Sequence, residues 1–132
     1  METQEFFKKW KSDSPKSFEG FRISLEKQWY PFDDTYIDNY GNFWIEMGDD
    51  RKSELPFEML TGIIEKFFED RNLSFLFVKN NETENINFNK WVGEVIETDV
   101  FIESEPLFYN TKTEAQISAY LKAAEILEKE LD

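Results

Sequence analysis

The sequence predicts an α+β domain in which a mostly antiparallel sheet of about four to six strands packs against two main helices, with a short N-terminal helix. Apolar residues recur at helical spacing in two long segments and alternate with polar residues in shorter segments between them. Strands and helices do not alternate regularly, which disfavours a parallel sheet. At 132 residues without a linker rich in Gly, Pro and Ser, we expect a single domain over residues 1–132.

Three segments have the spacing of amphipathic helices. Residues 3–10 predict a short one, because a capping Thr precedes three aromatic residues at three- and four-residue spacing. A second helix begins after Pro56, a residue tolerated at the first helical position, and carries an apolar stripe as far as Phe68. The third begins with a capping box at Thr111 and carries an apolar face over residues 117–131, so we expect it to reach the C-terminus.

The first half of the chain also contains strand patterns. In residues 21–25, Phe, Ile and Leu alternate with Arg and Ser, which is typical of a half-buried strand. The sequence NYGN at 39–42 predicts a hairpin turn between an extended segment at 35–39 and a strand at 43–47. The following sequence MGDDRKSE predicts a turn that leads into the second helix.

The second half contains two further strand regions. The short apolar run LSFLFV at 73–78, bounded by polar residues, predicts a central strand of the sheet. Residues 91–104 predict one or two more strands, with Gly93 at a bulge or bend.

The chain contains neither cysteine nor histidine. Without cysteine, disulfides, thiolate metal sites and cysteine nucleophiles are excluded, and we expect a protein of the cytoplasm. Without histidine, the most common general base and metal ligand are missing, so we expect a protein that is not an enzyme and needs no cofactor. Because no run of 18 apolar residues occurs, we expect no membrane segment.

The net charge of −13 is concentrated in two windows. Residues 28–50 contain six carboxylates and residues 91–111 contain five, and neither window contains Lys or Arg. These 11 carboxylates account for most of the excess. A field of this sign repels nucleic acid and anionic membranes, so we expect no direct binding to either and favour basic protein partners.

Both windows predict one partner-binding surface. If ETDVFIESEP at 97–106 is one extended strand, its alternate carboxylates form a row with neighbours roughly 6.6 to 6.8 Å apart, which repels itself unless solvent or a cationic partner screens it. The first window adds aromatic rings that can stack on guanidinium groups, with Tyr36, Tyr40 and Trp44 as anchors. The predicted surface consists of Asp33, Asp34, Tyr36, Asp38, Tyr40, Trp44, Glu46, Glu97, Asp99, Glu103 and Glu105.

Two carboxylate patterns suggest chemistry instead. Glu103 and Glu105 have the residue type of a glycosidase acid–base pair, but a small domain offers little cleft. Asp50-Arg51-Lys52 matches the D-x-K arm of a metal-dependent nuclease, with Asp33 or Asp38 as the earlier ligand. We expect the D-x-K motif in a turn and not in a strand, which disfavours a nuclease. Neither pattern therefore changes the expectation of a non-enzyme.

The segment FYNTKTEAQISAYLKAAEILEKEL, residues 108–131, resembles the ending of many small uncharacterised phage and prophage proteins. In these proteins an aromatic strand end leads through Thr and Glu-Ala into an amphipathic helix. The resemblance covers about a fifth of the chain and gives no residue a catalytic role. It implies a small acidic phage protein, similar in style to the anti-CRISPR and anti-restriction inhibitors that block host defence complexes, some of them by imitating nucleic-acid charge.

The expected function is therefore that of an acidic inhibitor, a nucleic-acid mimic that binds a basic, nucleic-acid-binding protein of the host, such as a defence complex, and competes with its substrate. One alternative is a structural or accessory phage protein whose acidity serves only solubility, because most charge runs are solvated faces. The second alternative is a small metal-dependent hydrolase. The identity of the partner and the oligomeric state are left open by the sequence.

Overall fold

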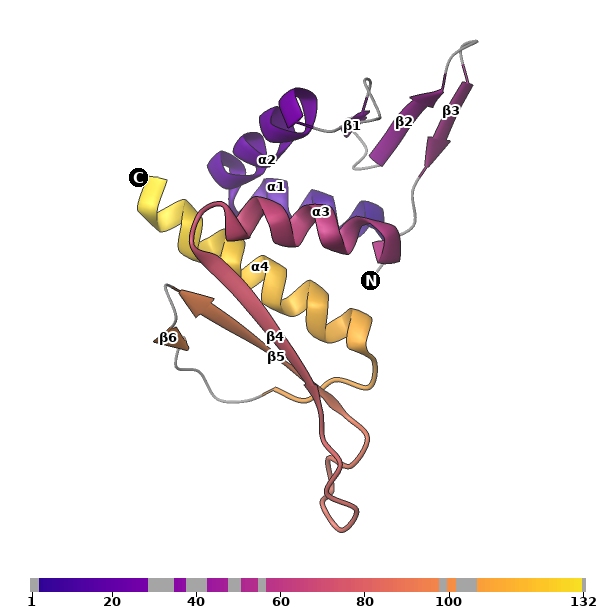
Figure 1. The fold of residues 1–132 in the computed structure, drawn as a ribbon, viewed down its shortest axis with the longest axis vertical. Helices are drawn as coiled ribbons and strands as arrows, with labels where there is room; N and C mark the ends of the chain where they lie inside the picture. The colour runs from indigo at the N-terminus through magenta and orange to yellow at the C-terminus, as the bar shows by residue number, and fades with distance from the viewer. Residues whose placement is uncertain are drawn as a thin grey trace. The chain divides into compact units, whose positions relative to one another are not determined.

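The computed structural model describes residues 3–28, 35–37, 43–47, 51–54, 57–97, 100–101 and 107–131 (Figure 1). Side chains are described for residues 3–25, 57–97 and 107–131. The elements in chain order are α1 (Thr3–Asp13), α2 (Pro15–Gln28), β1 (Thr35–Ile37), β2 (Phe43–Met47), β3 (Arg51–Glu54), α3 (Phe57–Glu69), β4 (Leu73–Lys79), β5 (Trp91–Glu97), β6 (Val100–Phe101) and α4 (Lys112–Leu131).

The chain divides into two compact units. Met1–Ile64 together with Ala124–Asp132 form the first, and Glu65–Ala123 form the second. The boundaries fall inside α3 and α4, so each of these helices contributes residues to both units. The single domain expected over residues 1–132 stays a prediction.

An aromatic core holds the first unit together. On α1, Phe6, Phe7 and Trp10 are buried at the expected three- and four-residue spacing, which confirms the predicted N-terminal helix. The indole of Trp10 stacks on the ring of Phe21 from α2, with 4.8 Å between the ring centroids. The ring of Phe6 meets the edge of Phe57 at 5.4 Å. Because such rings bury large apolar areas, this cluster stabilises the packing of α1 on α2.

The strand predicted at residues 21–25 is wrong, because these residues belong to helix α2. Phe18, Phe21 and Leu25 are buried while Ile23 is exposed, so the apolar residues follow a period of three to four and not of two. Ser14 separates α1 from α2, and Pro15 occupies the first position of α2, where a missing N–H costs nothing.

The start of α2 is capped from the far end of the sequence. The carboxylate of Glu128 on α4 accepts the backbone N–H of Ser17 at 2.8 Å and that of Lys16 at 3.2 Å. The hydroxyl of Ser17 in turn accepts the indole N–H of Trp10 at 2.8 Å and donates to the carbonyl of Ser14 at 3.1 Å. First-turn N–H groups have no partner within their own helix, so a carboxylate at this position satisfies two of them.

A small antiparallel sheet, in the order β1-β2-β3, belongs to the first unit. Ile37 pairs with Phe43 and Thr35 with Ile45, as expected for the predicted hairpin. Its turn residues 38–42 and the side chains of its strands lie outside the described part. The turn expected over MGDDRKSE is wrong in its second half, because β3 begins at Arg51 and pairs with β2.

The second unit contains a sheet in the order β4-β5-β6 and most of α4. Phe75 and Phe77 of β4 present their rings to Tyr120 of α4, with centroid distances of 5.0 Å and 6.1 Å. β4 lies at the edge of this sheet, so its prediction as a central strand is wrong. The predicted cap of the last helix is confirmed, because the Thr111 hydroxyl accepts the backbone N–H of Glu114 at 3.2 Å.

The fold is α+β, but the predicted single sheet of four to six strands against two main helices is wrong. The described segments form four helices, and their strands lie in two separate sheets. Only two antiparallel strands, β4 and β5, pair over seven residues in these segments, and β6 adds two residue pairs. One expected strand is part of α2, and the described strands pair only within the groups β1-β2-β3 and β4-β5-β6. No helix in the described ranges is long and apolar enough to cross a membrane.

Candidate interaction surface

The β4–β5 hairpin is a regular ladder that one glycine allows to approach α4. Leu73 to Lys79 pair with Glu97 to Trp91 without interruption, so Gly93 forms neither the bulge nor the bend that the sequence suggested. A Cβ atom at Gly93 would lie 2.8 Å from the carbonyl oxygen of Ala115 on α4 and 3.0 Å from the ring of Phe77. Gly93 is therefore required by close packing of strand on helix.

The loop that joins β4 to β5, residues 80–90, holds its shape through its own hydrogen bonds. Asn80 extends the ladder through two bonds. Its N–H donates to the carbonyl of Lys90 at 2.8 Å, and its carbonyl accepts the N–H of Asn89 at 2.9 Å. The side chain of Asn85 accepts the N–H of Asn87 at 2.8 Å and donates to the carboxylate of Glu82 at 3.2 Å. Short-range bonds of this kind are typical of asparagine-rich turns.

Further bonds close the same loop. The N–H groups of Asn85, Phe88 and Lys90 each donate to the carbonyl three residues earlier, at 3.0 Å in every case. Asn89 has a positive φ of 65°, a conformation that asparagine tolerates better than most residues. These bonds stabilise one loop conformation.

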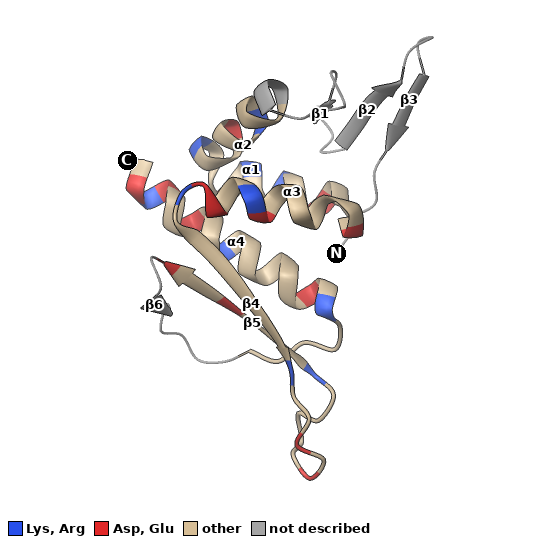
Figure 2. Cartoon of the chain, viewed as in Figure 1, with Lys and Arg blue, Asp and Glu red and all other residues tan. Residues whose placement is uncertain are grey.

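This ordered loop exposes apolar side chains next to carboxylates. Ile86 is 91% exposed and Phe88 is 40% exposed, although both are apolar. Glu82 and Glu84 are exposed on the same loop. We call these four residues, Glu82, Glu84, Ile86 and Phe88, the hairpin tip. Figure 2 shows acidic residues at the far end of the loop and basic residues where the loop joins the two strands.

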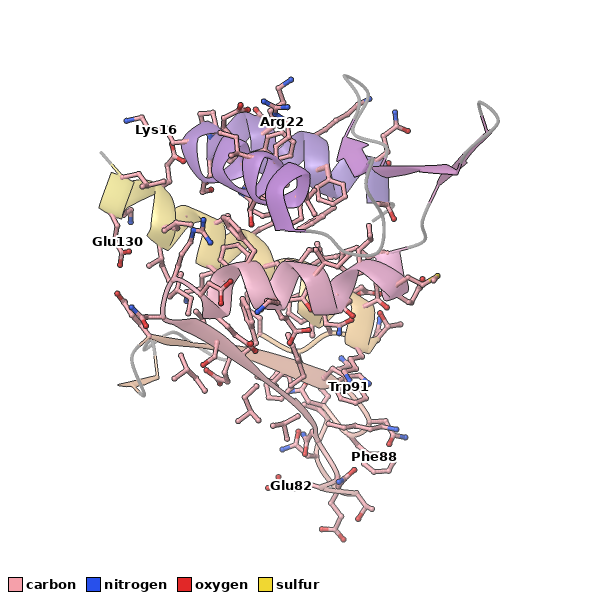
Figure 3. The ribbon with its side chains drawn as sticks, turned by 45° about the horizontal axis from the view of Figure 1, so that its top comes forward. Lys16, Arg22, Glu82, Phe88, Trp91 and Glu130 are labelled. Atoms are coloured by element: carbon pink, nitrogen blue, oxygen red, sulfur yellow. The ribbon has the colours of Figure 1, made fainter. Side chains whose placement is uncertain are left out.

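Trp91 and Tyr109 anchor the loop where it joins β5. Trp91 exchanges two backbone hydrogen bonds with Tyr109, of 2.7 Å and 2.8 Å. The ammonium of Lys112 lies 5.6 Å from the centroid of the Trp91 ring, and the hydroxyl of Tyr109 donates to the hydroxyl oxygen of Ser118 at 2.7 Å. Figure 3 shows Phe88 and Trp91 on the same side of the hairpin, with Glu82 farther along the loop. The loop is thus fixed to residues that lead into α4.

A buried phenol in this unit has a structural role. Tyr120 is buried and donates a hydrogen bond of 2.9 Å from its hydroxyl to the carboxylate of Glu65. Burial raises the pKa of Tyr120, and the negative charge of Glu65 and this hydrogen bond raise it further. The phenol is therefore a fixed donor and not a base at neutral pH.

Most residues of the predicted acidic surface lie outside the described residues, namely Asp33, Asp34, Asp38, Tyr40, Asp99, Glu103 and Glu105. Tyr36 and Trp44 are directly paired across β1 and β2, which places two of the three predicted anchors together in the backbone register. Glu46 pairs with Lys52 of β3. Glu97 ends β5, belongs to the second unit and is half-buried. That the two acidic windows form one surface stays a prediction.

The interpretation of ETDVFIESEP as one extended row is wrong. Glu97 pairs with Val100 and Ile96 pairs with Phe101 in an antiparallel ladder, so the chain reverses between β5 and β6. A period of two cannot continue through a reversal, and Glu97 does not begin an unbroken strand of carboxylates.

The sequence analysis missed Ile86 and Phe88. The polar boundary that the sequence gives to the strand at 73–78 is KNNETEN, residues 79–85, and no prediction covers Ile86 and Phe88. The available signal was two isolated apolar residues, two positions apart, within a polar run that is too short to bury them. Exposure of this kind is invisible until the loop conformation is known.

The D-x-K interpretation also changes. Arg51 and Lys52 lie in strand β3, so the reason for placing this motif in a turn was wrong. Asp50 and both candidate partners, Asp33 and Asp38, lie outside the described residues. Across the ranges that the structure does describe, no group of three or more acidic residues is placed to hold a metal ion.

Comparison with known proteins gives this chain no family. No protein family, curated protein or solved structure matches it.

Proposed function

We propose that the protein is a non-enzymatic interaction protein that binds a basic surface of another protein through carboxylates and a few apolar anchors. The observation that carries this proposal is the hairpin tip. In a chain of net charge −13, a hydrogen-bonded loop exposes Ile86 and Phe88 beside Glu82 and Glu84. Such a loop fits a partner pocket that is apolar at its centre and basic at its rim.

The energetics favour this use of the tip. Complete burial of an exposed aliphatic or aromatic side chain contributes about 1.5 to 3 kcal/mol. Ile86 can gain most of this range, and Phe88, which is already partly buried, can gain a smaller part. Because the loop is already ordered by its own hydrogen bonds, binding loses little additional conformational entropy. An apolar pair exposed on a flexible loop would lack this advantage.

The charge supports a basic partner. Long-range attraction between an acidic chain and a basic protein accelerates association and weakens as salt is added. A protein whose basic surface normally binds nucleic acid fits this charge, and an acidic chain on that surface would compete with its substrate. We therefore extend the proposal to an inhibitor of a nucleic-acid-binding protein, as in anti-defence proteins of phages. This extension is supported by charge and by the resemblance of residues 108–131.

Affinity capture from a lysate of the host cell tests the proposal. The bait is the full chain with an N-terminal tag, compared with a variant that carries Ile86→Ser and Phe88→Ser. Met59→Ser is the matched control, because Met59 is also an exposed apolar residue but lies on α3. We expect wild type and the control to recover the same basic proteins at low salt, with loss in the double variant and release at high salt. Equal recovery by all three baits contradicts the role of the hairpin tip.

A second variant tests the acidic window of residues 91–111 separately. Glu97, Asp99, Glu103 and Glu105 are changed to Lys together, and folding is checked by circular dichroism. We expect capture of the basic proteins to be abolished. Unchanged capture would show that the carboxylates of residues 97–105 serve solubility alone.

A further inference from the structure

The outer edge of β4 carries backbone groups without partners among the described residues. Trp91 directs both its N–H and its carbonyl to Tyr109, away from β4. Its pair across the ladder is Lys79, so the peptide groups of Lys79 also point away from β5. By the alternation of an antiparallel ladder, those of Phe77 and Phe75 point the same way. None of these three residues has a backbone hydrogen bond to another described residue on that side.

This edge lacks the usual protection of an exposed strand. β4 has the sequence LSFLFVK, with no proline and no bulge, and all seven of its residues pair in register with β5. Its single charge, Lys79, lies at the end next to the loop. Natural sheet edges are commonly blocked by proline, bulges, short length or inward-pointing charges, so an open regular edge is suited to strand addition.

The side chains beside this edge define what kind of strand it accepts. Phe75 and Phe77 face α4, so the alternate residues Leu76 and Val78 face the other side, where they are 43% and 48% exposed. Glu94 is the ladder partner of Leu76, so a carboxylate lies within this apolar face. An added strand with alternating apolar and basic residues would cover the apolar groups and bring a cation near Glu94.

We infer that the β4 edge binds an extended segment of the partner protein as an added strand, and that this segment alternates apolar residues with Lys or Arg. A second copy of the chain is disfavoured as the occupant, because two molecules of net charge −13 repel each other. The choice of a basic segment rests on the proposed function. The strand addition itself rests on the peptide groups of Phe75, Phe77 and Lys79, which have no partner on that side among the described residues.

The probe is the synthetic peptide acetyl-Lys-Val-Lys-Val-Lys-Val-Lys-amide, titrated into the full ¹⁵N-labelled chain. Its acidic counterpart, with Glu in place of Lys, is the control peptide. We expect the basic peptide to slow hydrogen exchange at the amides of Phe75, Phe77 and Lys79, and the acidic peptide to leave it unchanged. Protection elsewhere, or no protection by the basic peptide, overturns the inference.

Two variants of Lys79 separate the contribution of its backbone N–H to binding from that of its side-chain charge. Lys79→Pro removes an N–H that points away from β5, whereas Lys79→Ala removes the same charge and keeps the N–H. We expect the proline variant to bind the basic peptide about five- to tenfold more weakly than the alanine variant. Equal affinities overturn the inference. If the proline variant unfolds, Val78→Lys is used instead, and it must weaken binding of the basic peptide relative to Val78→Thr.

Sedimentation of the chain without peptide tests whether a second copy of the chain occupies the β4 edge. A dimer in which the same three amides are protected without peptide would overturn the basic segment as the occupant and assign the edge to a second copy. Failure here is distinguishable from failure of the proposed function, because the capture experiment depends on Ile86 and Phe88 and not on Lys79.

Discussion

A Cβ atom on Gly93 would lie 2.8 Å from the carbonyl oxygen of Ala115, so β5 lies closer to α4 than any side chain at position 93 permits. This contact fixes where the sheet of the second unit meets its helix. A backbone carbonyl within a helix cannot move aside as the end of a flexible side chain can.

We predict that Gly93→Ala destabilises the protein by about 1 to 3 kcal/mol, because overpacking at this contact forces strand and helix apart. Gly62→Ala is the matched control. Gly62 lies within α3, and beyond its chain neighbours and the nearby backbone of α3 a methyl group there would meet no described atom within 4 Å. Alanine should therefore stabilise by about 0.5 to 1 kcal/mol through helix propensity. Urea denaturation measures both. Similar stabilities of the two variants would contradict the close approach.

A second prediction concerns the cap of α2. Glu128→Ala removes the acceptor of two backbone N–H groups and should lower the free energy of unfolding by about 1 to 2 kcal/mol. Glu125→Ala removes a carboxylate from the same helix that forms an exposed ion pair with Lys129, and should change stability by about 0.5 kcal/mol or less. Thermal denaturation followed by circular dichroism distinguishes the two variants. A Glu128 variant as stable as the Glu125 variant would rule out the cap.

The third prediction is a pH dependence. The pKa of Tyr120 is raised above its ordinary value of 10.0 by burial and by Glu65, so the fold favours the neutral phenol. The unfolded chain ionises first as the pH increases, so this contribution to stability is complete below about pH 10 and is lost progressively above it. Tyr120→Phe cannot ionise, so its stability should decline less between pH 9 and pH 11. Parallel declines of wild type and variant, measured by urea denaturation, would contradict the assignment.

The fourth prediction tests whether the hairpin tip is ordered by its own bonds. Asn85→Ala removes the acceptor for the N–H of Asn87 and the donor to Glu82, so motion of the loop on the picosecond to nanosecond timescale should increase. Asn81→Ala changes an exposed asparagine of the same loop and should have little effect. Amide order parameters at Ile86 and Phe88 report the difference. If both variants leave them unchanged, the Asn85 bonds do not order the tip.

Helices were predictable from the sequence where a capping motif or a long apolar stripe was present. The capping box at Thr111 and the stripe from Phe57 to Phe68 specify helix type without tertiary information, and both helices form at these residues. In α2, however, Phe21, Ile23 and Leu25 satisfy a period of two by coincidence. Phe18 and Phe21 pack against Phe7 of α1, and Leu25 is also buried, so burial at helical spacing determines the helix. Tertiary contacts of this kind override a short local pattern.

Sheet organisation and the candidate site were not predictable from local patterns. The run LSFLFV is apolar at every position except Ser74, which is typical of a strand covered on both faces, yet Leu76 and Val78 are partly exposed. Whether a strand is central or at an edge depends on pairing between distant residues. Likewise, the composition located carboxylates along the chain but not the exposed Ile86 and Phe88, because their exposure depends on the fold of the loop.

The bond between Glu128 and Ser17 joins residues 111 positions apart in the chain. During synthesis on the ribosome, α1 and α2 are made long before Glu128, so the first turn of α2 must remain without this acceptor until α4 has been made. The aromatic rings of α1 and α2 can pack together as soon as both helices are made. The first unit is complete only when α4 is present. Folding of this unit should therefore be completed only after Glu128 has left the ribosome.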